Sequence, residues 1–405
     1  MSWIDEFPQR LADLDAQHLR RVRREVVADP AHEGGTHLLV NGAPMLAFCS
    51  NDYMGLAQHP RLKAVAAQAA QALGVGSGAS ALISGYGASD AALERELAAH
   101  VGMPSALYYT SGYMANIGSI PALVGKGDAV FADQLNHACL IDGVRLSKAD
   151  VHLYPSADLS ALEAQLAQST HRRKLIVTDA VFSMDGNIID LPALLALAEK
   201  YDALVMIDDA HGFGVLGDKG QGSMAHWGLL DAQGKASPLA QQRLLYMATL
   251  GKAAGVMGAF VAGRADLIEW LVQKSRSFIF ATSAPPILSQ TLRESLRIIA
   301  GEPERRTHLQ ALIAQLREGV QAICAAHPER GWKLLPSDTA IQPLIIGSNE
   351  AAMNLMKQLW AEGIWAPAIR PPTVPAGTAR LRIALSAGHT HQDLQRLIDA
   401  LQTAH

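Results

Sequence analysis

The chain has 405 residues, of which 49% are hydrophobic and 18% are charged, and its formal net charge at pH 7 is -4. These values predict a folded protein of two or three domains, at roughly 100–200 residues per domain, and they exclude extensive disorder. A net charge so close to zero gives no basic excess for nucleic-acid binding.

The cysteines and the N-terminal residues favour a cytoplasmic location. The cysteines are odd in number and far apart, and they form no CxxC pair: Cys49, Cys139 and Cys324. This pattern argues against a disulfide framework and against a zinc site. Charges are spread through the first residues, which argues against a signal peptide, and no apolar run reaches the ~18–20 residues of a membrane span. We therefore expect no membrane partner and no nucleic-acid partner.

The first predicted element is an amphipathic helix over residues 3–27. Its apolar residues recur at near-helical spacing: Trp3, Phe7, Leu11, Leu14 and Leu19. The end of this helix is predicted to be a solvated face, because it contains Arg20, Arg21, Arg23 and Arg24. A β-hairpin is expected next, since the apolar runs 37–40 and 45–48 flank an Asn-Gly turn.

Helices and apolar strands alternate through the middle of the chain. The predicted strands are 106–109, 129–132, 151–154, 175–180, 203–208, 244–249 and 258–262. Helical patterns lie between several of them, at 114–124, 137–147, 158–168 and 192–200. Continuous Val, Ile and Leu runs separated by helices indicate an α/β fold with a mostly parallel sheet covered on both faces.

The pattern changes after about residue 290. Long helices are predicted at 286–300 and 306–326, and short strands near 341–346 and 380–385 flank a helix at 350–362, with a last helix at 391–402. We expect three parts: an N-terminal segment (1–50), a large α/β domain (51–290) and a small α+β domain (291–405). The N-terminal segment is expected to join the small domain.

Ligands of open α/β sheets bind beyond the carboxyl ends of the strands, and the sequence TSGYMAN follows the strand 106–109. Ser111, Gly112 and Tyr113 would present backbone N–H groups at the start of a helix, where a phosphate is favoured. Gly112 would let the backbone approach closely. An ordinary helix cap is the alternative interpretation.

Three further polar residues follow other strands. His137 comes after the strand 129–132 and is either a structural histidine or one that stacks on an aromatic cofactor ring. Asp208 ends the strand 203–208, and a buried carboxylate requires a partner such as a pyridinium nitrogen. His211 would reach a phenolic oxygen of the same ring. Metal binding is the rival interpretation of Asp208 and His211, although no third ligand is nearby in the sequence.

Among the lysines, only Lys252 directly follows an apolar strand and precedes a run of small residues. A lysine near a low-dielectric sheet edge has a lowered pKa, and its neutral amine forms imines. Thr249 would add a hydroxyl for a phosphate. A surface-loop lysine is the alternative for this position taken alone. The chain order of these residues nonetheless describes pyridoxal 5'-phosphate held at its phosphate, ring face, ring nitrogen, phenolic oxygen and reactive carbon.

These residues resemble the fold-type I pyridoxal-phosphate enzymes and, among them, the α-oxoamine synthases. The resemblance covers essentially the whole chain, through SNDYMGL (50–56), the glycine-rich segment 74–87, TDAVFSMDG (178–186), DDAHGFG (208–214) and TLGK (249–252). The glycine-rich segment lacks the third glycine of a dinucleotide-binding motif and follows a helical run, so a nucleotide site is not expected there. The resemblance implies a large domain with a seven-stranded sheet and a smaller domain.

The resemblance also implies roles for individual residues. Lys252 would form a Schiff base with the cofactor, with His137, Asp208 and His211 as catalytic partners. Other cofactor contacts would come from Gly112, Tyr113, Ser183 and Thr249. Asn51 and Arg382 would bind the carboxylate of the amino acid. The acyl substrate would contact Thr373 and either Arg20 or Arg21. No metal site is implied.

The segment RPPTVPAGTARLR (370–382) narrows the expected substrates. It resembles family members that condense L-alanine with a pimeloyl thioester, on acyl carrier protein or CoA, during biotin biosynthesis. The resemblance also implies a cytoplasmic homodimer with its active site at the subunit interface. A glycine C-acetyltransferase activity, an aminotransferase activity and a catalytically silent cofactor-binding protein remain alternatives.

Overall fold

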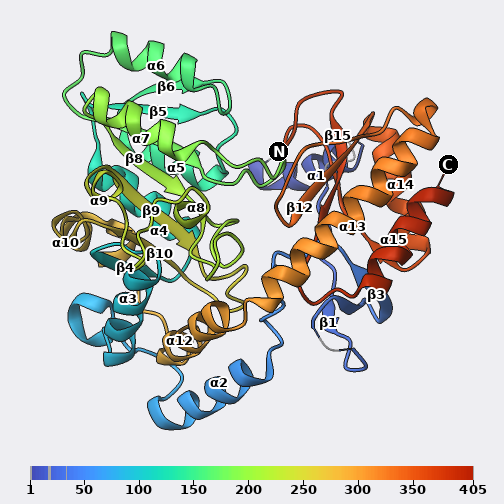
Figure 1. The fold of residues 1–405 in the computed structure, drawn as a ribbon, viewed down its shortest axis with the longest axis horizontal. Helices are drawn as coiled ribbons and strands as arrows, with labels where there is room; N and C mark the ends of the chain where they lie inside the picture. The colour runs from blue at the N-terminus through green and yellow to red at the C-terminus, as the bar shows by residue number, and fades with distance from the viewer. Residues whose placement is uncertain (1, 17–19, 33, 405) are drawn as a thin grey trace.

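The computed structural model describes residues 2–16, 20–32 and 34–404, and Figure 1 shows them as two lobes. One lobe contains a seven-stranded sheet of order β4-β10-β9-β8-β7-β5-β6. Its strands are β4 (Ser105–Tyr109), β5 (Ala129–Asp133), β6 (Asp150–Tyr154), β7 (Lys174–Asp179), β8 (Leu204–Asp208), β9 (Leu244–Thr249) and β10 (Ala259–Gly263). All pairs are parallel except those that β10 makes with β4 and β9. The predicted strands and the mostly parallel sheet are confirmed.

The sheet is buried on both faces because successive side chains of a strand point in opposite directions. In β4, Leu107 and Tyr109 join one hydrophobic cluster, and Ala106 and Tyr108 join the other. The first cluster contains residues of α4 (Gly112–Leu123), α5 (Ala138–Ser147) and α10 (Ala265–Lys274), beside α11 (Arg276–Ile279). The second contains residues of α3 (Ala88–His100), α6 (Leu159–Gln168), α7 (Leu191–Lys200), α8 (Ser223–His226), α9 (Pro238–Arg243) and α12 (Pro286–Gly301). Helix α2 (Pro60–Leu73) packs on α12.

The other lobe in Figure 1 contains two four-stranded sheets. One has the order β11-β12-β15-β14, formed by β11 (Lys333–Leu334), β12 (Ile341–Gly347), β15 (Ala379–Ala384) and β14 (Ala368–Ile369). It is accompanied by α13 (Glu304–Ala326), α14 (Asn349–Ala361) and α15 (His391–Thr403). The second sheet has the order β1-β2-β3-β13, formed by β1 (Val26–Ala28), β2 (His37–Val40), β3 (Ala43–Ala47) and β13 (Ile364–Trp365). Parallel pairing of β3 with β13 joins the N-terminal segment to the C-terminal part of the chain. The domain boundaries near residues 50 and 290 stay a prediction.

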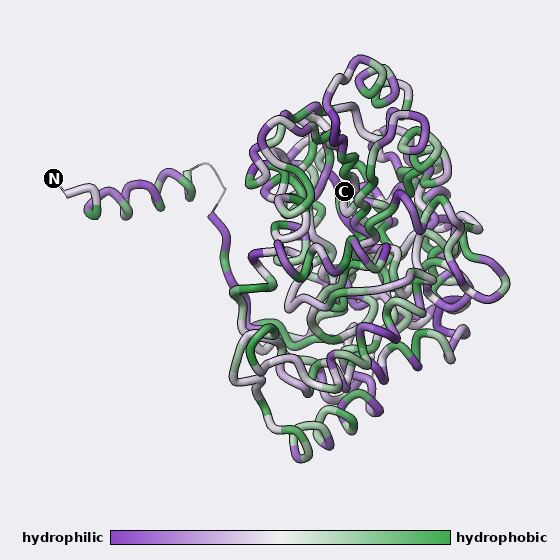
Figure 2. The backbone as a smooth tube through the Cα atoms, turned by 90° about the vertical axis from the view of Figure 1, so that its left-hand side faces the viewer, coloured by the Kyte–Doolittle hydropathy of each residue, from purple (hydrophilic) through white to green (hydrophobic). Residues whose placement is uncertain are grey.

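The predicted helix over residues 3–27 is wrong in its second half. A 3₁₀ turn η1 (Trp3–Glu6) leads into α1 (Phe7–Ala16), whereas residues 20–25 are not helical and β1 begins at Val26. Strand pairing of β1 with β2 outweighs the helical pattern there. Leu19 of the predicted apolar stripe lies outside the described residues. Figure 2 shows α1 projecting from the body of the molecule, with no buried residue. The Asn41-Gly42 turn of the predicted hairpin is confirmed, since both residues have positive φ.

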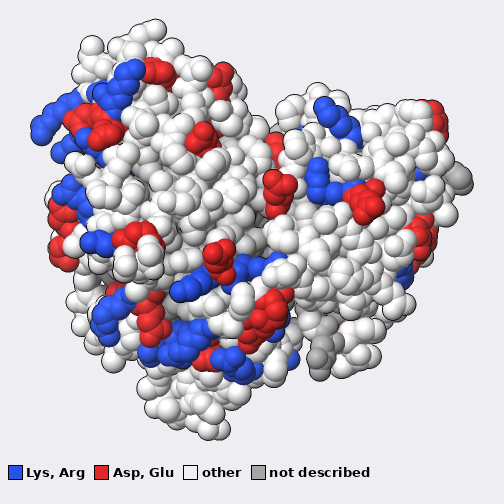
Figure 3. Space-filling view, in the orientation of Figure 1, with Lys and Arg blue, Asp and Glu red and all other residues white. Residues whose placement is uncertain are grey.

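The face in Figure 3 carries basic and acidic side chains next to one another over most of its charged area, and the surface is hollowed between the two lobes. Mixed charge of this kind agrees with the small net charge of the chain. Within the described ranges, no helix is long and apolar enough to cross a membrane.

Candidate active site

Polar side chains from five neighbouring segments meet beyond the carboxyl ends of the central strands. A cavity of about 170 Å³ is lined there by Gly112, Tyr113, His137, Cys139, Asp179, Asp208, Ala210, His211, Met247, Thr249 and Lys252. These residues follow or end β4, β5, β7, β8 and β9, which place them at one edge of the sheet. Open α/β sheets bind ligands at this edge.

A hydrogen-bonded chain runs from Lys252 through His211 to Tyr53. Lys252 Nζ lies 2.8 Å from His211 Nε2, and His211 Nδ1 lies 2.6 Å from the Tyr53 hydroxyl. Tyr53 donates its own proton to Asn51 Oδ1 at 3.0 Å, so the hydroxyl accepts from His211 Nδ1–H. The His211 Nε2 lone pair is then left to accept from Lys252 Nζ.

Burial sets the protonation of Lys252 and His211 in this series of hydrogen bonds. The pKa of Lys252 is lowered mainly by burial, against the opposing effect of the Asp208 and Asp179 charges. Burial, with the positive charges of Lys252 and Arg382, holds the pKa of His211 well below its ordinary value. His211 is therefore neutral, and the Lys252 amine loses its proton more easily than an exposed lysine.

Arg382 connects this chain to a second group of residues. Its guanidinium donates from Nη2 to Asn51 Oδ1 at 3.3 Å and to the Tyr53 hydroxyl at 3.4 Å, and from Nε to the Ser183 carbonyl at 2.6 Å. Arg382 is only 6% exposed. A buried guanidinium beside the lysine can pair with a planar carboxylate.

Asp208 is 4% exposed at the end of β8 and is held by donors on two sides. Asn116 Nδ2 donates to Asp208 Oδ2 at 2.7 Å, and the Ala210 backbone N–H donates to Oδ1 at 3.0 Å. The Cys139 thiol lies 4.0 Å from the same Oδ2. These donors stabilise a negative charge at the base of the cavity.

His137 lies at the start of α5, where Asp179 fixes its backbone. Its N–H donates to Asp179 Oδ2 at 2.8 Å, and its Nδ1 lies 2.8 Å from Cys139 Sγ. Burial lowers the pKa of His137 and favours a neutral ring. Asp179 pairs with Asp208 across β7 and β8, and burial together with that neighbouring charge raises the pKa of Asp179 well above its ordinary value.

The other side of the cavity is the N-terminus of α4. Ser111 caps this helix by accepting from the Met114 N–H at 3.2 Å, and Gly112 and Tyr113 form its first turn. Gly112 permits close packing, because a Cβ there would lie 2.9 Å from Met247 Cε. Thr249 donates to the Gly258 carbonyl at 3.1 Å and lines the cavity next to this turn, since a Cβ on Gly112 would lie 3.6 Å from Thr249 Oγ1.

Three residues predicted to bind the acyl substrate lie elsewhere. Arg20 and Arg21 are exposed and line a separate groove with α14. Thr373 is exposed on the turn after Arg370, to whose carbonyl its N–H donates. Arg20, Arg21, Arg23 and Arg24 are exposed, as expected, but the helix predicted for them is wrong, because the segment is not helical and the Arg24 guanidinium packs over Trp360. Their contacts with substrate stay predictions.

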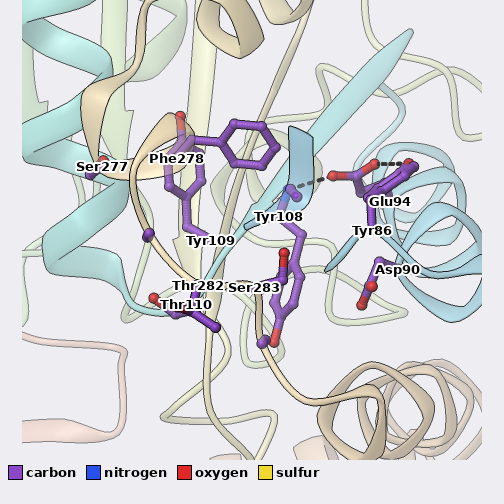
Figure 4. Close-up of a pocket in the computed structure, with 13 residues that line it drawn as sticks. Tyr86, Asp90, Glu94, Tyr108, Tyr109, Thr110, Ser277, Phe278, Thr282 and Ser283 are labelled. Carbon is purple, nitrogen blue, oxygen red and sulfur yellow. Dashed lines mark hydrogen bonds between the residues drawn. The ribbon is translucent and has the colours of Figure 1, made fainter. Parts of the chain in front are cut away.

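A second, smaller pocket lies between α3, β4 and the segment after α11 (Figure 4). Glu94 accepts there from the Tyr108 backbone N–H at 2.9 Å and from the Tyr86 hydroxyl at 2.5 Å. Burial raises the pKa of Glu94 to about 7. Thr282 and Ser283 line this pocket too, away from Lys252 of the same chain.

Four hydrogen-bonding side chains of the site were not assigned from the sequence: Tyr53, Asn116, Cys139 and Asp179. A signal existed for each. Tyr53 lies two residues after Asn51, and Asn116 lies four residues after Gly112, on the same helix face. Cys139 lies two residues after His137, and Asp179 ends a buried strand as Asp208 does. Among the described residues, no three histidine, cysteine or acidic side chains are grouped to hold a metal ion.

Comparisons with known proteins agree with this fold. The family model for aminotransferase class I and II matches residues 43–401. A solved structure of serine palmitoyltransferase from S. paucimobilis, with bound PLP-myriocin aldimine, superposes with a TM-score of 0.88 at 26% identity, covering 100% of this chain and 98% of that one. The fold and the site define a pyridoxal-phosphate-dependent enzyme of this aminotransferase class.

Curated relatives with high sequence identity show to which family within this class the chain belongs. The 8-amino-7-oxononanoate synthase 1 of Polaromonas sp. (strain JS666 / ATCC BAA-500) is 59% identical over 99% of this chain and 96% of its own length. The 8-amino-7-oxononanoate synthase of Delftia acidovorans (strain DSM 14801 / SPH-1) is also 59% identical, with the same coverage. The chain belongs to the 8-amino-7-oxononanoate synthase family.

The donor set of the cavity fits pyridoxal 5'-phosphate. An amine with a lowered pKa, a carboxylate held by two donors, and a helix N-terminus with no acidic side chain in its first turn surround one space. They match the carbonyl, the pyridine nitrogen and the phosphate of the cofactor, respectively.

Proposed function

We propose that the chain condenses L-alanine with a pimeloyl thioester to form 8-amino-7-oxononanoate. The bond formed joins the alanine Cα to the thioester carbonyl carbon. The thiol carrier leaves, and the alanine carboxyl group is lost as carbon dioxide. The hydrogen-bonded chain Lys252–His211–Tyr53–Arg382 carries this proposal, because it joins a basic amine to a carboxylate-binding guanidinium.

Pyridoxal phosphate, when bound, supplies a carbonyl that condenses with amines and a pyridinium ring that withdraws electrons from the amino-acid Cα. Lys252 Nζ would bind that carbonyl and then move the Cα proton. Asp208 would hold the proton on the ring nitrogen, and His137 would cover the ring. Gly112, Tyr113 and Thr249 would bind the phosphate, and Ser183 and His211 would contact the cofactor.

Arg382 and Asn51 would orient the alanine carboxylate. Arg382 is buried, which would shield a bound carboxylate from bulk water, and its hydrogen bond to Tyr53 supports a position for that carboxylate near Lys252. Thr373 and either Arg20 or Arg21 would contact the acyl substrate. We further propose a cytoplasmic homodimer, with acyl carrier protein or CoA as the thiol carrier.

Thiol release from a panel of acyl thioesters tests the reaction. We expect release with L-alanine and a pimeloyl thioester, accompanied by stoichiometric carbon dioxide. Release with glycine and acetyl-CoA instead would move the chain to the acetyltransferase activity and overturn the proposal.

Borohydride reduction tests the assignment of Lys252. The reduced holoenzyme should carry the mass of the cofactor on the peptide that contains Lys252, because only an amine that is easily deprotonated forms a stable imine at neutral pH. Lys252→Ala should retain no cofactor after denaturation and should lose at least about 10³-fold in kcat, since one group acts as both binding partner and base. Lys126→Ala, an exposed lysine before β5, is the control. Label on another lysine would contradict the assignment.

A further inference from the structure

A basic groove of about 750 Å³ lies outside the cofactor cavity, between residues 20–24 and α14. Its described lining contains a single acidic residue, Asp15, which pairs with Arg20 at 2.6 Å. Its basic residues are Arg20, Arg21, Arg24, Lys357 and Arg370. A local positive excess is unexpected on a chain whose net charge is -4, so it points to an anionic partner.

The floor of the groove is apolar and formed by one face of α14. Met353, Met356, Lys357 and Trp360 follow one another at spacings of three, one and three residues, which places them on a common helix face. The opposite face of α14 buries Leu355 and Leu359 in the core. Methionine, tryptophan and arginine together are typical of protein-binding surfaces.

The two tryptophans of the groove are not arranged as parallel rings between which a nucleotide base could stack. Trp360 and Trp365 meet edge to face, with an interplanar angle of 74°. The Arg24 guanidinium lies 5.1 Å from the Trp360 ring centre and 5.8 Å from that of Trp365. Because Arg24 covers both rings, the groove favours a protein surface over a stacked nucleotide.

The groove adjoins the candidate active site through the backbone. Pro367, which lines the groove, accepts at its carbonyl from the Arg382 N–H at 3.0 Å. Ala368 pairs with Leu381, the neighbour of Arg382 on β15. Burial raises the pKa of Cys49, and the positive charges of Arg382 and Arg24 oppose that shift, so Cys49 lies within electrostatic range of both arginines. A partner held in the groove would therefore deliver a tethered group to the site.

We propose that this groove docks the acidic face of an acyl carrier protein, which presents the thioester substrate to the neighbouring site. This inference rests on the proposed function and selects the carrier protein over CoA as the acyl donor. The cations steer and hold the acidic carrier, and the methionines and tryptophans pack against its apolar side chains.

Lys357→Glu tests the groove, because Lys357 is exposed and lies on its rim. With the pimeloyl thioester of acyl carrier protein, we expect KM to rise about tenfold at low salt while kcat changes less than about twofold. With pimeloyl-CoA, the change in KM should stay below about threefold. Lys333→Glu is the matched control, because Lys333 is on β11, at the opposite edge of the sheet from β14, whose Ala368 lines the groove. The kinetics of this variant should equal those of the unaltered enzyme.

Binding of unacylated, phosphopantetheinylated carrier protein separates docking from catalysis. The unaltered holoenzyme should bind it, more weakly as salt rises, and both Lys357→Glu and Arg21→Glu should weaken binding about tenfold. Equal losses with CoA and carrier-protein substrates, or unchanged carrier binding in both variants, would overturn the docking proposal. Carrier binding without product formation would overturn only the proposed reaction.

Discussion

At the scale of single residues, the site depends on how buried charges are partnered. Lys252 and His211 share a hydrogen bond, and burial lowers the pKa of both, which favours their neutral forms. Asn116 and the Ala210 backbone each donate a hydrogen bond to the carboxyl group of Asp208. A buried carboxylate without such donors would be protonated and could not stabilise a pyridinium.

Asn116→Leu should slow the reaction without weakening substrate binding. The change removes the donor 2.7 Å from Asp208 Oδ2, so the carboxylate competes with the ring nitrogen for the proton. A hydrogen bond to a buried charge contributes about 1.5–3 kcal/mol, which predicts a kcat about ten- to a hundredfold lower with a nearly unchanged KM for alanine. The pH dependence of the absorbance of the bound cofactor should shift as well.

Cys139→Ala removes a more distant contact to the same Asp208 oxygen, so its effect on kcat can be compared with that of Asn116→Leu. Its thiol is 4.0 Å from the same oxygen, so we expect kcat to fall by less than about threefold. Equal effects of the two variants, or a loss of thermal stability in Asn116→Leu with normal kcat and spectrum, would mean that Asn116 only packs the helix.

At the scale of elements, backbone contacts between distant segments hold the site together. The loop after β9 packs against the segment of Asn51, since a Cβ on Gly255 would lie 2.6 Å from the Ala57 nitrogen. Arg380 of β15 pairs with Asp185 and so fixes the loop that contains Ser183. His389, before α15, accepts from the Ser386 N–H at Nδ1 and lies 3.1 Å from the Ala47 carbonyl at the end of β3.

His389 should make stability depend on pH in the acidic range. Burial lowers its pKa to about 4 in the folded protein, against about 6.5 when unfolded. Well above pH 6.5 the histidine is unprotonated in both states, and the contribution is fully present. As pH falls from 6.5 towards 4, only the unfolded state takes up the proton, so the free energy of unfolding drops by about 2 kcal/mol at pH 5.

Thermal melting at pH 7.5 and pH 5 measures this effect. His389→Gln keeps one donor and one acceptor but does not titrate, so its Tm should fall less over this interval than that of the unaltered protein. Carboxylates titrate in both proteins and cancel in the comparison. Parallel decreases in Tm would assign the acid sensitivity to other groups.

At the scale of the whole molecule, exposed apolar surface gathers beside the pocket of Figure 4. Ile83 is 80% exposed and Phe280 is 69% exposed. Their segments are tied together, since the Ser283 N–H donates to the Ala79 carbonyl at 3.0 Å and Ser80 bridges to Thr282. Apolar side chains so exposed on adjoining segments are typical of a subunit interface.

Ile83→Asp should convert the proposed dimer to monomers. A charge at a buried interface position costs more than the contact it replaces, and sedimentation velocity at micromolar concentration should show the smaller species. Leu153→Asp is the control: Leu153 is 56% exposed on β6, at the other end of the sheet from β4. A dimer unaffected by Ile83→Asp would place the interface elsewhere.

The sequence by itself determined the strands, the helices between them and the positions of Lys252, Asp208, His137 and His211. These follow from local rules, because an apolar run predicts a buried strand and a polar residue after it falls at the strand's carboxyl end. Only the tertiary structure decided that Tyr53 links His211 to Arg382 and that Asn116 donates to Asp208. Tyr53 and His211 are 158 residues apart in the sequence, and Asn116 and Asp208 are 92 residues apart.

The extended segment 20–25 shows the same limit of local patterns. Its arginines fit a helix, yet β1 pairs with β2 and Arg24 packs over Trp360, a residue far along the chain. Hydrogen bonding and packing with distant residues contribute more free energy than the small differences in intrinsic helix propensity. Such contacts depend on how the chain folds back on itself, and no local pattern encodes them.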